Sequence, residues 1–502
     1  MELDVFSNLA TGFSAAVSFQ NLGFAMMGCL LGTLIGVLPG IGPIATLAML
    51  LPITFHLEQL SSLIMLAGIY YGAQYGGSTT SILVNMPGEA SSVVTCIDGY
   101  QMARRGRAGA ALCVAALGSF FAGCVGTVFI SAFAPPLGAF AQQFSSPDYF
   151  SLMVLGLVTA VVLAQGSVLK SIAVIIIGLM FGLVGTDVNA GVTRYTLGIP
   201  DLWDGLSFLP MVIGMFGVVE IIRNLERPTF ERSAVSANLR ELWPTAAELR
   251  QAAPAIVRGT GLGSLLGILP GGGAVLASFA AYSVEKQIAR DPSRFGKGAI
   301  EGVAGPEAAN NAAAQTSFIP LLTLGLPSNA VMALMVGAMM IQGIAPGAVV
   351  MTSNPDLFWG LIASMWIGNL MLLIINLPMI GLWVRLLTVP YRVLYPAILS
   401  FCVIGVFASN AEFSQIIIMA SFALFGYVLV RFGCEPAPMI LGFILGPLME
   451  ENLRRSLVLS RGDLMIFLQQ PISATLLGLT AVVVVLIVLP FLRRKREEAF
   501  AE

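Results

Sequence analysis

Apolar residues form long runs along most of the chain, and short polar segments separate these runs. The runs that we expect to cross a membrane lie near residues 109–134, 149–165, 167–186, 207–223, 357–384, 396–410, 413–430, 436–450 and 474–492. Their lengths approach the roughly 20 residues that a helix needs to cross the hydrocarbon core of a bilayer. Because lipid offers the backbone no hydrogen-bond partners, the pattern predicts an all-α polytopic membrane protein with about 11–15 membrane crossings.

Composition supports the same class of protein. Of the 502 residues, 57% are hydrophobic and 10% are charged, against roughly 45–50% and about 25% in globular chains. The net charge of -2 gives no reason to expect a nucleic-acid partner. The six cysteines include no CxxC pair, and the single histidine, His56, leaves no basis for a Ser-His-Asp triad or an HExxH site. We therefore do not expect an enzyme.

Basic residues cluster in a few places and predict which loops face the cytoplasm. The clusters are Arg104 to Arg107, Arg223 to Arg258, Lys286 to Lys297 and Arg493 to Arg496. Short cytoplasmic loops carry an excess of Lys and Arg. The chain then threads with its N-terminus outside and its C-terminus in the cytoplasm. The stretch 451–463 is an exception, since it contains three Arg but is assigned to the outside.

An internal repeat divides the membrane domain into two halves. GTLIGVLPGIGP at residues 32–43 matches GSLLGILPGGGA at 263–274 in seven of 12 positions, and a weaker match pairs Asn85–Ala90 with Gly325–Ala330. The loops that follow these motifs carry opposite charge patterns in the two copies, which predicts a repeat of inverted topology. The predicted parts are a first half at 1–223, a cytoplasmic connector with a surface helix at 224–253, a second half at 254–450, and a loop, a final transmembrane helix and a basic cytoplasmic tail at 451–502.

Proline and glycine interrupt an apolar run at the same place in both halves. Proline removes a backbone donor and glycine tolerates positive φ, so each LPG motif is expected to break its helix. Such a break is either a close-packed kink or a discontinuous helix or re-entrant hairpin that faces a substrate cavity. Ala274 stands in the second copy where the first has Pro43, and Ser328 stands where the first has Gly88.

Neutral polar side chains gather beside these breaks, between Tyr70 and Ser81 and between Glu307 and Ser317. Taken singly, Ser and Thr here are accounted for by bonds to helix carbonyls or contacts between helices. Taken together, the two clusters favour a polar binding site. The candidate residues for binding substrate or ion are Gly36, Pro39, Gly40, Gly42, Gly76, Gly77, Ser78, Thr79, Thr80, Asn85, Pro87, Gly88, Pro270, Gly271, Gly273, Asn310, Asn311, Thr316, Pro327, Ser328 and Asn329.

These segments contain no Lys or Arg, so an anion would be bound by the N–H groups and partial positive charge of exposed helix N-termini. Carbonyls freed at the breaks, with Asn and Thr oxygens, suit a sodium ion, the one cofactor considered. Glu89, Asp98, Glu301 and Glu307 are candidates for carrying coupling protons. We nevertheless expect these four acids at the wet ends of helices.

At these motifs the sequence resembles a known family. The LPG repeat, YYGAQYGGSTTSILVNMPGEASSV, DGYQMARRGRAG and GPEAANNAAAQTSFIPLLTLGLPSNAV are similar to the large membrane subunit of the tripartite tricarboxylate transporters, from about residue 20 to 450. The resemblance implies a secondary transporter in the bacterial inner membrane. It further implies a small membrane subunit, a periplasmic substrate-binding protein, and import of citrate or other di-, tri- or aromatic carboxylates driven by a sodium or proton gradient.

Two other functions are considered. A gradient-independent anion channel would use the same broken helices but would have no need of a delivery protein. A membrane-embedded enzyme is disfavoured, because the repeat is typical of transporters and no catalytic set is present in the sequence.

Overall fold

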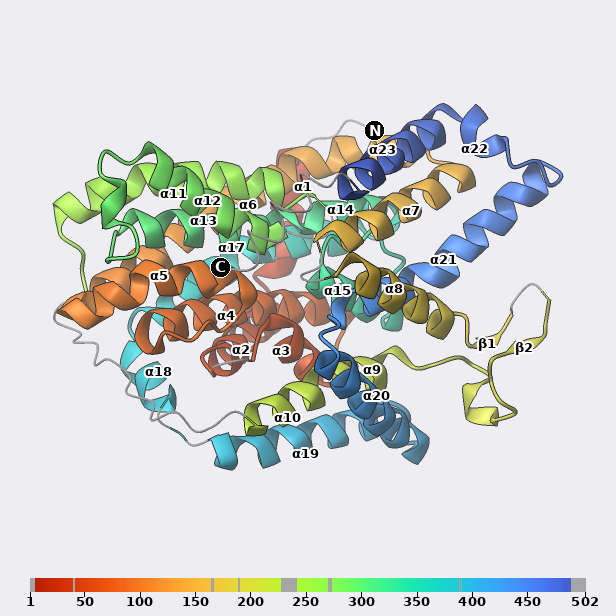
Figure 1. Ribbon diagram of the computed structural model, residues 1–502, viewed down its shortest axis with the longest axis horizontal. Helices are drawn as coiled ribbons and strands as arrows, with labels where there is room; N and C mark the ends of the chain where they lie inside the picture. The colour runs from red at the N-terminus through yellow and green to blue at the C-terminus, as the bar shows by residue number, and fades with distance from the viewer. Residues whose placement is uncertain are drawn as a thin grey trace.

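The computed structural model describes residues 5–38, 41–163, 167–187, 190–226, 242–269, 273–387, 389 and 391–488. Helices dominate these ranges, which confirms the prediction of an all-α polytopic membrane protein (Figure 1). Within the described residues, five helical segments are long and apolar enough to cross a membrane, namely Phe19–Gly36, Ala90–Ala141, Phe208–Glu226, Pro355–Asn376 and Phe413–Arg431.

The first half is built from helices of very different lengths. They are α1 (Val5–Ala16), α2 (Phe19–Gly36), α3 (Pro43–Leu50), η1 (Leu51–Thr54), α4 (Gln59–Val84), η2 (Ala90–Ser92), α5 (Val93–Met102), the π-helix η3 (Ala103–Arg107), α6 (Ala108–Ala141), α7 (Ser146–Leu163), α8 (Val168–Gly182), η4 (Pro200–Leu202), α9 (Phe208–Val212), the π-helix η5 (Ile213–Val218) and α10 (Val219–Glu226).

The second half begins with helices that correspond to those of the first. They are α11 (Ala246–Leu266), α12 (Gly273–Ile288), η7 (Pro292–Arg294), α13 (Glu301–Thr316), α14 (Phe318–Leu324) and α15 (Ala330–Ile341). Of these, α11, α12 and α13 occupy the places of α2, α3 and α4. The remaining helices are α16 (Val349–Ser353), α17 (Pro355–Asn376), α18 (Ile380–Leu387), α19 (Tyr391–Asn410), α20 (Phe413–Arg431), α21 (Ala437–Leu459), α22 (Ile466–Gln469) and α23 (Pro471–Val488).

Glycines bring α2 and α4 into backbone contact. A Cβ added at Gly28, Gly32 or Gly36 would overlap with the carbonyl of Met65, Ile69 or Ala73 respectively. Residue numbers rise together along both helices, so α2 and α4 run parallel. Small residues at such spacing let membrane helices approach closely.

The same contact recurs between α11 and α13. Gly259, Gly263 and Gly267 lie against the carbonyls of Gly305, Ala309 and Ala313. The three glycines follow Gly28, Gly32 and Gly36 at a constant offset of 231, and their three partners follow Met65, Ile69 and Ala73 at a constant offset of 240. The two helix pairs therefore share both sequence spacing and packing.

A helix must return between each parallel pair. Ser61, near the start of α4, donates a hydrogen bond of 2.7 Å to Asn21 near the start of α2. Since α2 ends at Gly36 beside Ala73, the intervening α3 and η1 run antiparallel to both. The LPG break thus joins two antiparallel segments and lies opposite the middle of α4.

The two groups of helices meet along α13. In Figure 1 the α11–α12–α13 group lies beside the α2–α3–α4 group, and α13 contacts α4, α5 and α6. Nearly all of α4 and all of α13 after Glu301 are buried inside the protein. These helices carry both polar clusters predicted from the sequence.

Two segments differ from the sequence-based expectation. Residues 451–459, predicted as a loop, continue α21 to Leu459. The reason is side-chain pairing along the helix, since Arg454 pairs with Glu450 at 2.7 Å and Arg455 pairs with Glu451, both four residues apart. Of the connector 224–253, residues 227–241 lie outside the described part, and the expected surface helix is the start of α11, capped by Thr245 and Glu248.

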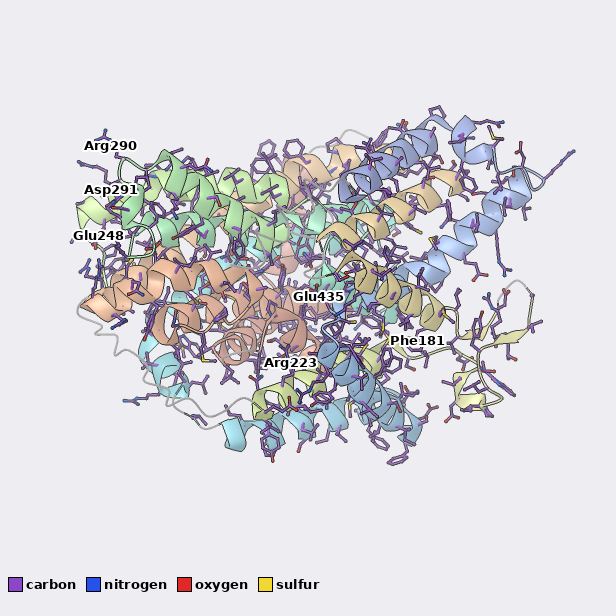
Figure 2. All side chains as sticks on the ribbon, in the orientation of Figure 1. Phe181, Arg223, Glu248, Arg290, Asp291 and Glu435 are labelled. Atoms are coloured by element: carbon purple, nitrogen blue, oxygen red, sulfur yellow. The ribbon has the colours of Figure 1, made fainter. Side chains whose placement is uncertain are left out.

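A small antiparallel hairpin, β1 (Gly185–Thr186) paired with β2 (Thr193–Arg194), projects between α8 and α9. Ion pairs tie it to α21: Arg194 bonds Glu450 at 2.8 Å, and Arg454 bonds Asp187 at 3.0 Å. The hairpin lies at the end of the molecule opposite Glu248, Arg290 and Asp291 (Figure 2).

Candidate functional site

A cavity of about 820 Å³ lies where the broken segments of both halves converge. Gly42, Pro87 and Gly88 line it from the first half, and Ala274 and Asn329 line it from the second. Small-molecule sites are typically clefts of about 300–1,000 Å³ with mainly apolar walls and a few polar groups. The cavity has that character, since most of its lining side chains are apolar and a few polar ones come from the two tips, from α4 and from α10.

Five α-helices begin at this cavity. The lining includes residues from the first turn of α3, α5, α12, α15 and α21, represented by Pro43, Val93, Ala274, Ala330 and Ala437. The first N–H groups of a helix have no partner within the helix, and the helix dipole places partial positive charge there. Convergence of these N-termini favours an anion, whereas the carboxyl groups of Glu89, Glu220 and Glu435, which also line the cavity, oppose one.

The tip after α4 depends on one left-handed residue and one close contact. Asn85 ends α4 with φ 57°, and its counterpart Gly325 ends α14 with φ 70°. The chain then turns back, so that a Cβ at Gly88 would overlap with the Cα of Gly77. In the second half the hydroxyl of Ser328 instead donates to the carbonyl of Ser317 at 3.2 Å. The residues with positive φ are thus Asn85 and Gly325. Position 88 needs glycine because any side chain there would overlap with Gly77.

One cation in the cavity was missed by the sequence analysis. Arg223 of α10 lines the cavity and lies 3.2 Å from Glu220 (Figure 2). The motif segments themselves contain no Lys or Arg, as noted, but α10 brings Arg223 to the same space from outside the motifs. Its position near the end of an apolar segment was the signal available in the sequence.

Glu89 joins the two halves at the cavity wall. Its carboxylate accepts hydrogen bonds from Asn310 at 2.9 Å and from Ser91 at 2.6 Å. The Asn310 side chain also has an acceptor atom, Oδ1, which is buried and has no hydrogen-bond partner in the described structure. The same is true of Oε1 of Gln74, a residue that lines the cavity. The unpartnered oxygen of Gln74 belongs to a residue of the cavity wall, whereas Asn310 is joined to the cavity wall through Glu89.

A second polar cluster surrounds Glu307 in the middle of α13. Ser78 donates to Glu307 at 2.6 Å and Thr95 donates to its other carboxylate oxygen. Asn311 donates to Ser119 at 2.7 Å and to the carbonyl of Glu307 at 3.0 Å. Glu307 is fully buried. The residues of this cluster come from four helices, α4, α5, α6 and α13.

The expectation that the acids lie at wet helix ends is wrong for Glu307 and Asp98, which are both fully buried. Asp98 accepts bonds from the N–H groups of Gly298 and Ala299 at 2.7 and 2.8 Å, so it anchors the loop before α13. The expectation fits Glu301 better, since it pairs with Arg294 at 2.9 Å at the start of α13.

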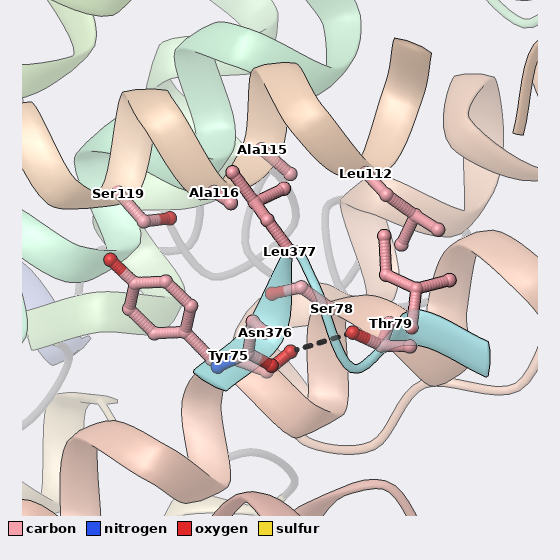
Figure 3. A pocket seen from close by; sticks show the side chains of 10 residues that line it. Tyr75, Ser78, Thr79, Leu112, Ala115, Ala116, Ser119, Asn376 and Leu377 are labelled. Carbon is pink, nitrogen blue, oxygen red and sulfur yellow. Dashed lines mark hydrogen bonds between the residues drawn. The ribbon is translucent and has the colours of Figure 1, made fainter. Parts of the chain in front are cut away.

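A small cavity of about 20 Å³ adjoins the Glu307 cluster (Figure 3). Tyr75, Ser78, Ser119 and Asn376 line it with oxygen atoms, and Thr79 lies at its edge. The Tyr75 hydroxyl and Oδ1 of Asn376 are buried without a hydrogen-bond partner in the described structure. A space of this size with several polar partners holds about one water molecule.

The predicted site residues separate into groups. Gly42, Pro87, Gly88 and Asn329 line the large cavity, and Gly273 lies beside Asn329. Ser78 and Thr79 line the small cavity, whereas Asn310 and Asn311 bond Glu89 and Ser119. The remaining described residues serve packing, caps or backbone bonds, namely Gly36, Gly76, Gly77, Thr80, Asn85, Thr316, Pro327 and Ser328. The other four lie outside the described residues, namely Pro39, Gly40, Pro270 and Gly271.

Thr95, Ser119 and Asn376 join the Glu307 cluster or the small cavity but were absent from the predicted set. Thr95 lies two residues beyond a motif, and Ser119 and Asn376 lie on mainly apolar helices outside the motifs. Their proximity depends on tertiary packing, so sequence spacing alone gave no signal.

Comparison with known proteins places the chain in a family. A protein from Agrobacterium vitis, "Uncharacterized 52.8 kDa protein in TAR-I ttuC' 3'region", is 56% identical over 500 residues, covering 100% of this chain and 99% of that protein. A second, "Uncharacterized protein in TAR-II ttuC' 3'region" from the same organism, is 62% identical over 240 residues, covering 48% of this chain and 99% of that protein. No solved structure matches the chain. The model of the tripartite tricarboxylate transporter TctA family matches residues 22–441, and the chain belongs to this family.

Proposed function

We propose that this protein is the large membrane subunit of a binding-protein-dependent secondary transporter that imports carboxylates, driven by a sodium or proton gradient. Membership of a tricarboxylate transporter family supports the transport role. The substrate class includes citrate and related di-, tri- or aromatic carboxylates. The carboxylate would bind in the large cavity between the two halves.

The observation that carries this proposal is the convergence of five helix N-termini on one cavity. Carboxylates are stabilised at helix N-termini by free N–H groups and by the helix dipole, at about 0.3–1 kcal/mol for each exposed site. Several such ends around one anion, together with Arg223, would offset the repulsion from the three acids in the lining. Transporters with discontinuous helices bind anionic substrate groups in this way.

Side chains in the cavity would add specificity. Arg223 provides a guanidinium, which can bind a carboxylate through two parallel hydrogen bonds. Gln74 and Asn329 provide amides, and Tyr70 provides a hydroxyl, for further polar groups of the substrate. Glu220 and Glu89 also line the cavity, but each already has partners in the protein.

The two packed helix pairs support a transport cycle built on repeats. We propose that the halves 1–223 and 254–450 are inverted repeats whose relative movement exposes the cavity alternately to each side. The glycine contacts make each pair of helices a tightly packed unit. The Asn310–Glu89 bond is one of several hydrogen bonds between the halves, with Ser78–Glu307 and Asn311–Ser119, and these bonds would have to exchange partners during such a movement.

Membrane placement and partners follow from the same proposal. The protein would lie in the bacterial inner membrane, with its N-terminus outside and its C-terminus in the cytoplasm, and work with a small membrane subunit and a periplasmic substrate-binding protein. The basic loops near Glu248, Arg290 and Asp291 lie together at one end of the molecule, as cytoplasmic loops would (Figure 2).

An uptake measurement would test the proposal. The complete tripartite system would be reconstituted in proteoliposomes, and uptake of radiolabelled citrate and a panel of carboxylates would be followed with and without binding protein, under sodium or proton gradients. We expect uptake that needs the binding protein and one of the gradients. Uptake that is indifferent to every gradient would support the anion channel instead, and the absence of uptake for all carboxylates would contradict the substrate class.

A further inference from the structure

Glu307 is a buried carboxyl group whose role in transport is separate from lining the large cavity. It is 0% exposed, and its hydrogen-bond donors are the neutral hydroxyls of Ser78 and Thr95. Among the ion pairs of the described residues, none includes Glu307. Burying a carboxylate without a cation costs several kcal/mol, so this group is poised to bind a proton. Ionisable residues inside membrane segments are often proton carriers.

The hydrogen bonds around Glu307 can accommodate both protonation states. The hydroxyl of Ser78 has one hydrogen but two acceptors within reach, Glu307 Oε2 at 2.6 Å and the carbonyl of Gln74 at 3.1 Å. When Glu307 is ionised, Ser78 donates to it. When a proton binds Oε2, the new O–H group donates to Ser78, and the Ser78 hydrogen turns to the carbonyl of Gln74. Loading and unloading therefore leave no atom of this chain of bonds without a partner.

The two helices that hold this network also reach the substrate cavity. On α4, Gln74 lines the cavity one turn before Ser78. On α13, Asn310 lies one turn after Glu307 and bonds Glu89, which lines the cavity. A carboxylate bound there places negative charge near Glu307, and a nearby negative charge raises the affinity of a carboxyl group for protons. Substrate and proton would thus bind cooperatively, which is the requirement for symport.

The small cavity offers space for a water molecule beside the hydrogen bonds of Glu307. Ser78 lines it and bonds Glu307, while Tyr75 and Asn376 present unpartnered oxygens on its other walls. One water molecule held there would lie beside the Ser78 hydroxyl, so a proton could pass between that water and Glu307 by exchange of hydrogen bonds. The proton leaves as hydronium, and the carboxylate is restored.

Other titratable groups near Glu307 already have defined surroundings. Tyr75 on α4, Cys96 on α5 and Glu89 before η2 interact with it electrostatically. Asp98 on α5 accepts hydrogen bonds from the backbone N–H groups of Gly298 and Ala299, just before α13. Glu285 on α12 is paired with Arg258 at 2.6 Å. Backbone donors thus compensate Asp98 and a cation compensates Glu285, whereas the donors to Glu307 are neutral hydroxyl groups.

We propose that Glu307 carries the coupling proton, binding it together with the carboxylate substrate and releasing it on the opposite side of the membrane. This inference rests on the proposed transport function and assigns its driving ion. It predicts that the proton-binding step and the substrate-binding step can be separated by mutation.

The test compares Glu307→Gln with the wild-type subunit in the complete reconstituted system. Glutamine imitates the protonated carboxyl, because its NH₂ group can donate to Ser78 and its oxygen can accept from Thr95. We expect E307Q to lose at least about tenfold in uptake driven by a pH gradient, a loss of about 1.4 kcal/mol in coupling. Exchange of labelled for unlabelled substrate without a gradient should stay near the wild-type rate, because exchange needs no proton release.

Three further variants distinguish a loss of proton coupling from a loss of folded protein. Glu307→Asp keeps a titratable group and should retain pH-gradient dependence at a lower rate. Ser78→Ala removes a donor to the ionised form and an acceptor for the protonated form; because the bond to the charged form is the stronger, half-maximal uptake should move to higher pH. Asp98→Asn is a control, because it alters another fully buried carboxyl group. The folded fraction of this variant should keep its dependence on the pH gradient.

Two results would overturn the inference. One is pH-gradient-driven accumulation by E307Q equal to wild type. The other is wild-type uptake driven by a sodium gradient with no accompanying proton movement. If the wild-type system moves no carboxylate under any gradient, the proposed function itself fails, which is a distinguishable outcome.

Discussion

The side-chain amide of Asn310 donates a hydrogen bond of 2.9 Å to the carboxylate of Glu89. This bond joins α13 of the second half to the tip that follows α4 in the first, at the wall of the large cavity. We therefore expect this bond to change both when substrate binds and when the halves move relative to each other.

Removing this bond should impair transport. Hydrogen bonds to charged groups contribute about 1.5–3 kcal/mol. Since about 1.4 kcal/mol corresponds to a factor of ten, Asn310→Ala should lower the ratio of maximal uptake rate to KM by about 10- to 100-fold. Asn310→Asp should be worse, since it places two carboxylates side by side. Initial uptake rates in proteoliposomes would measure both effects.

A suitable control is Asn452→Ala, since the Asn452 side chain bonds the carbonyl of Leu448 within α21. Its uptake should equal that of wild type. Equal rates for Asn310→Ala and Asn452→Ala would mean that the Glu89 bond has no part in the cycle.

The paired glycines make a prediction about stability. Gly32→Ala and Gly263→Ala would each drive a methyl group into a backbone carbonyl of the neighbouring helix, so both should lower the yield and the Tm of purified protein. Gly23→Ala and Gly261→Ala lie on the same helices, but their Cβ positions meet nothing within 4 Å. These controls should keep or slightly raise the Tm, because alanine is the better helix former. Equal Tm values within either pair would contradict the close packing.

Much of the fold followed from the sequence because the signals were local. The LPG motifs break the chain between α2 and α3 and between α11 and α12, as predicted from proline and glycine. Positions such as Gly42, Pro87 and Asn329 were chosen from their motifs and line the large cavity. Local sequence could not show that Gly88 faces Gly77, since that contact forms only when the tip turns back on α4.

Other parts of the site depend on contacts between distant elements. Arg223 reaches the cavity from α10, and Thr95 and Ser119 reach Glu307 and Asn311 from α5 and α6. The burial of Glu307 was missed for a related reason. Its sequence neighbours are small and polar, which suggested a wet helix end, but α4, α5 and α6 cover it.

Arg223 should contribute to substrate affinity. It is a cation in a cavity whose other charged residues include Glu89, Glu220 and Glu435. Arg223→Gln should raise KM for a carboxylate by about tenfold, equivalent to about 1.4 kcal/mol. Arg223→Lys should raise it less, because the charge stays while the two-bond geometry is lost. Uptake titrations would give these KM values, and Arg250→Gln, at an exposed position of α11, should leave KM unchanged.

The proposed inverted topology of the two halves predicts that equivalent loops lie on opposite sides of the membrane. Glu58, after the first LPG motif, and Ser293, after the second, are both exposed in the protein. Single cysteines would be introduced at each position in a background in which the six native cysteines are replaced. A membrane-impermeant maleimide should label the cysteine at 58 in intact spheroplasts but reach the one at 293 only after permeabilisation.

A third cysteine, at the exposed Tyr195 just after β2, should behave like the one at 58, because the hairpin lies at the end of the molecule opposite the basic loops. The orientation argument depends on the excess of Lys and Arg after the second LPG motif. Labelling of positions 58 and 293 from the same side would leave the shared helix packing intact but would rule out the inverted sense of the repeats. Alternating access by exchange of two inverted halves would then lose its structural basis.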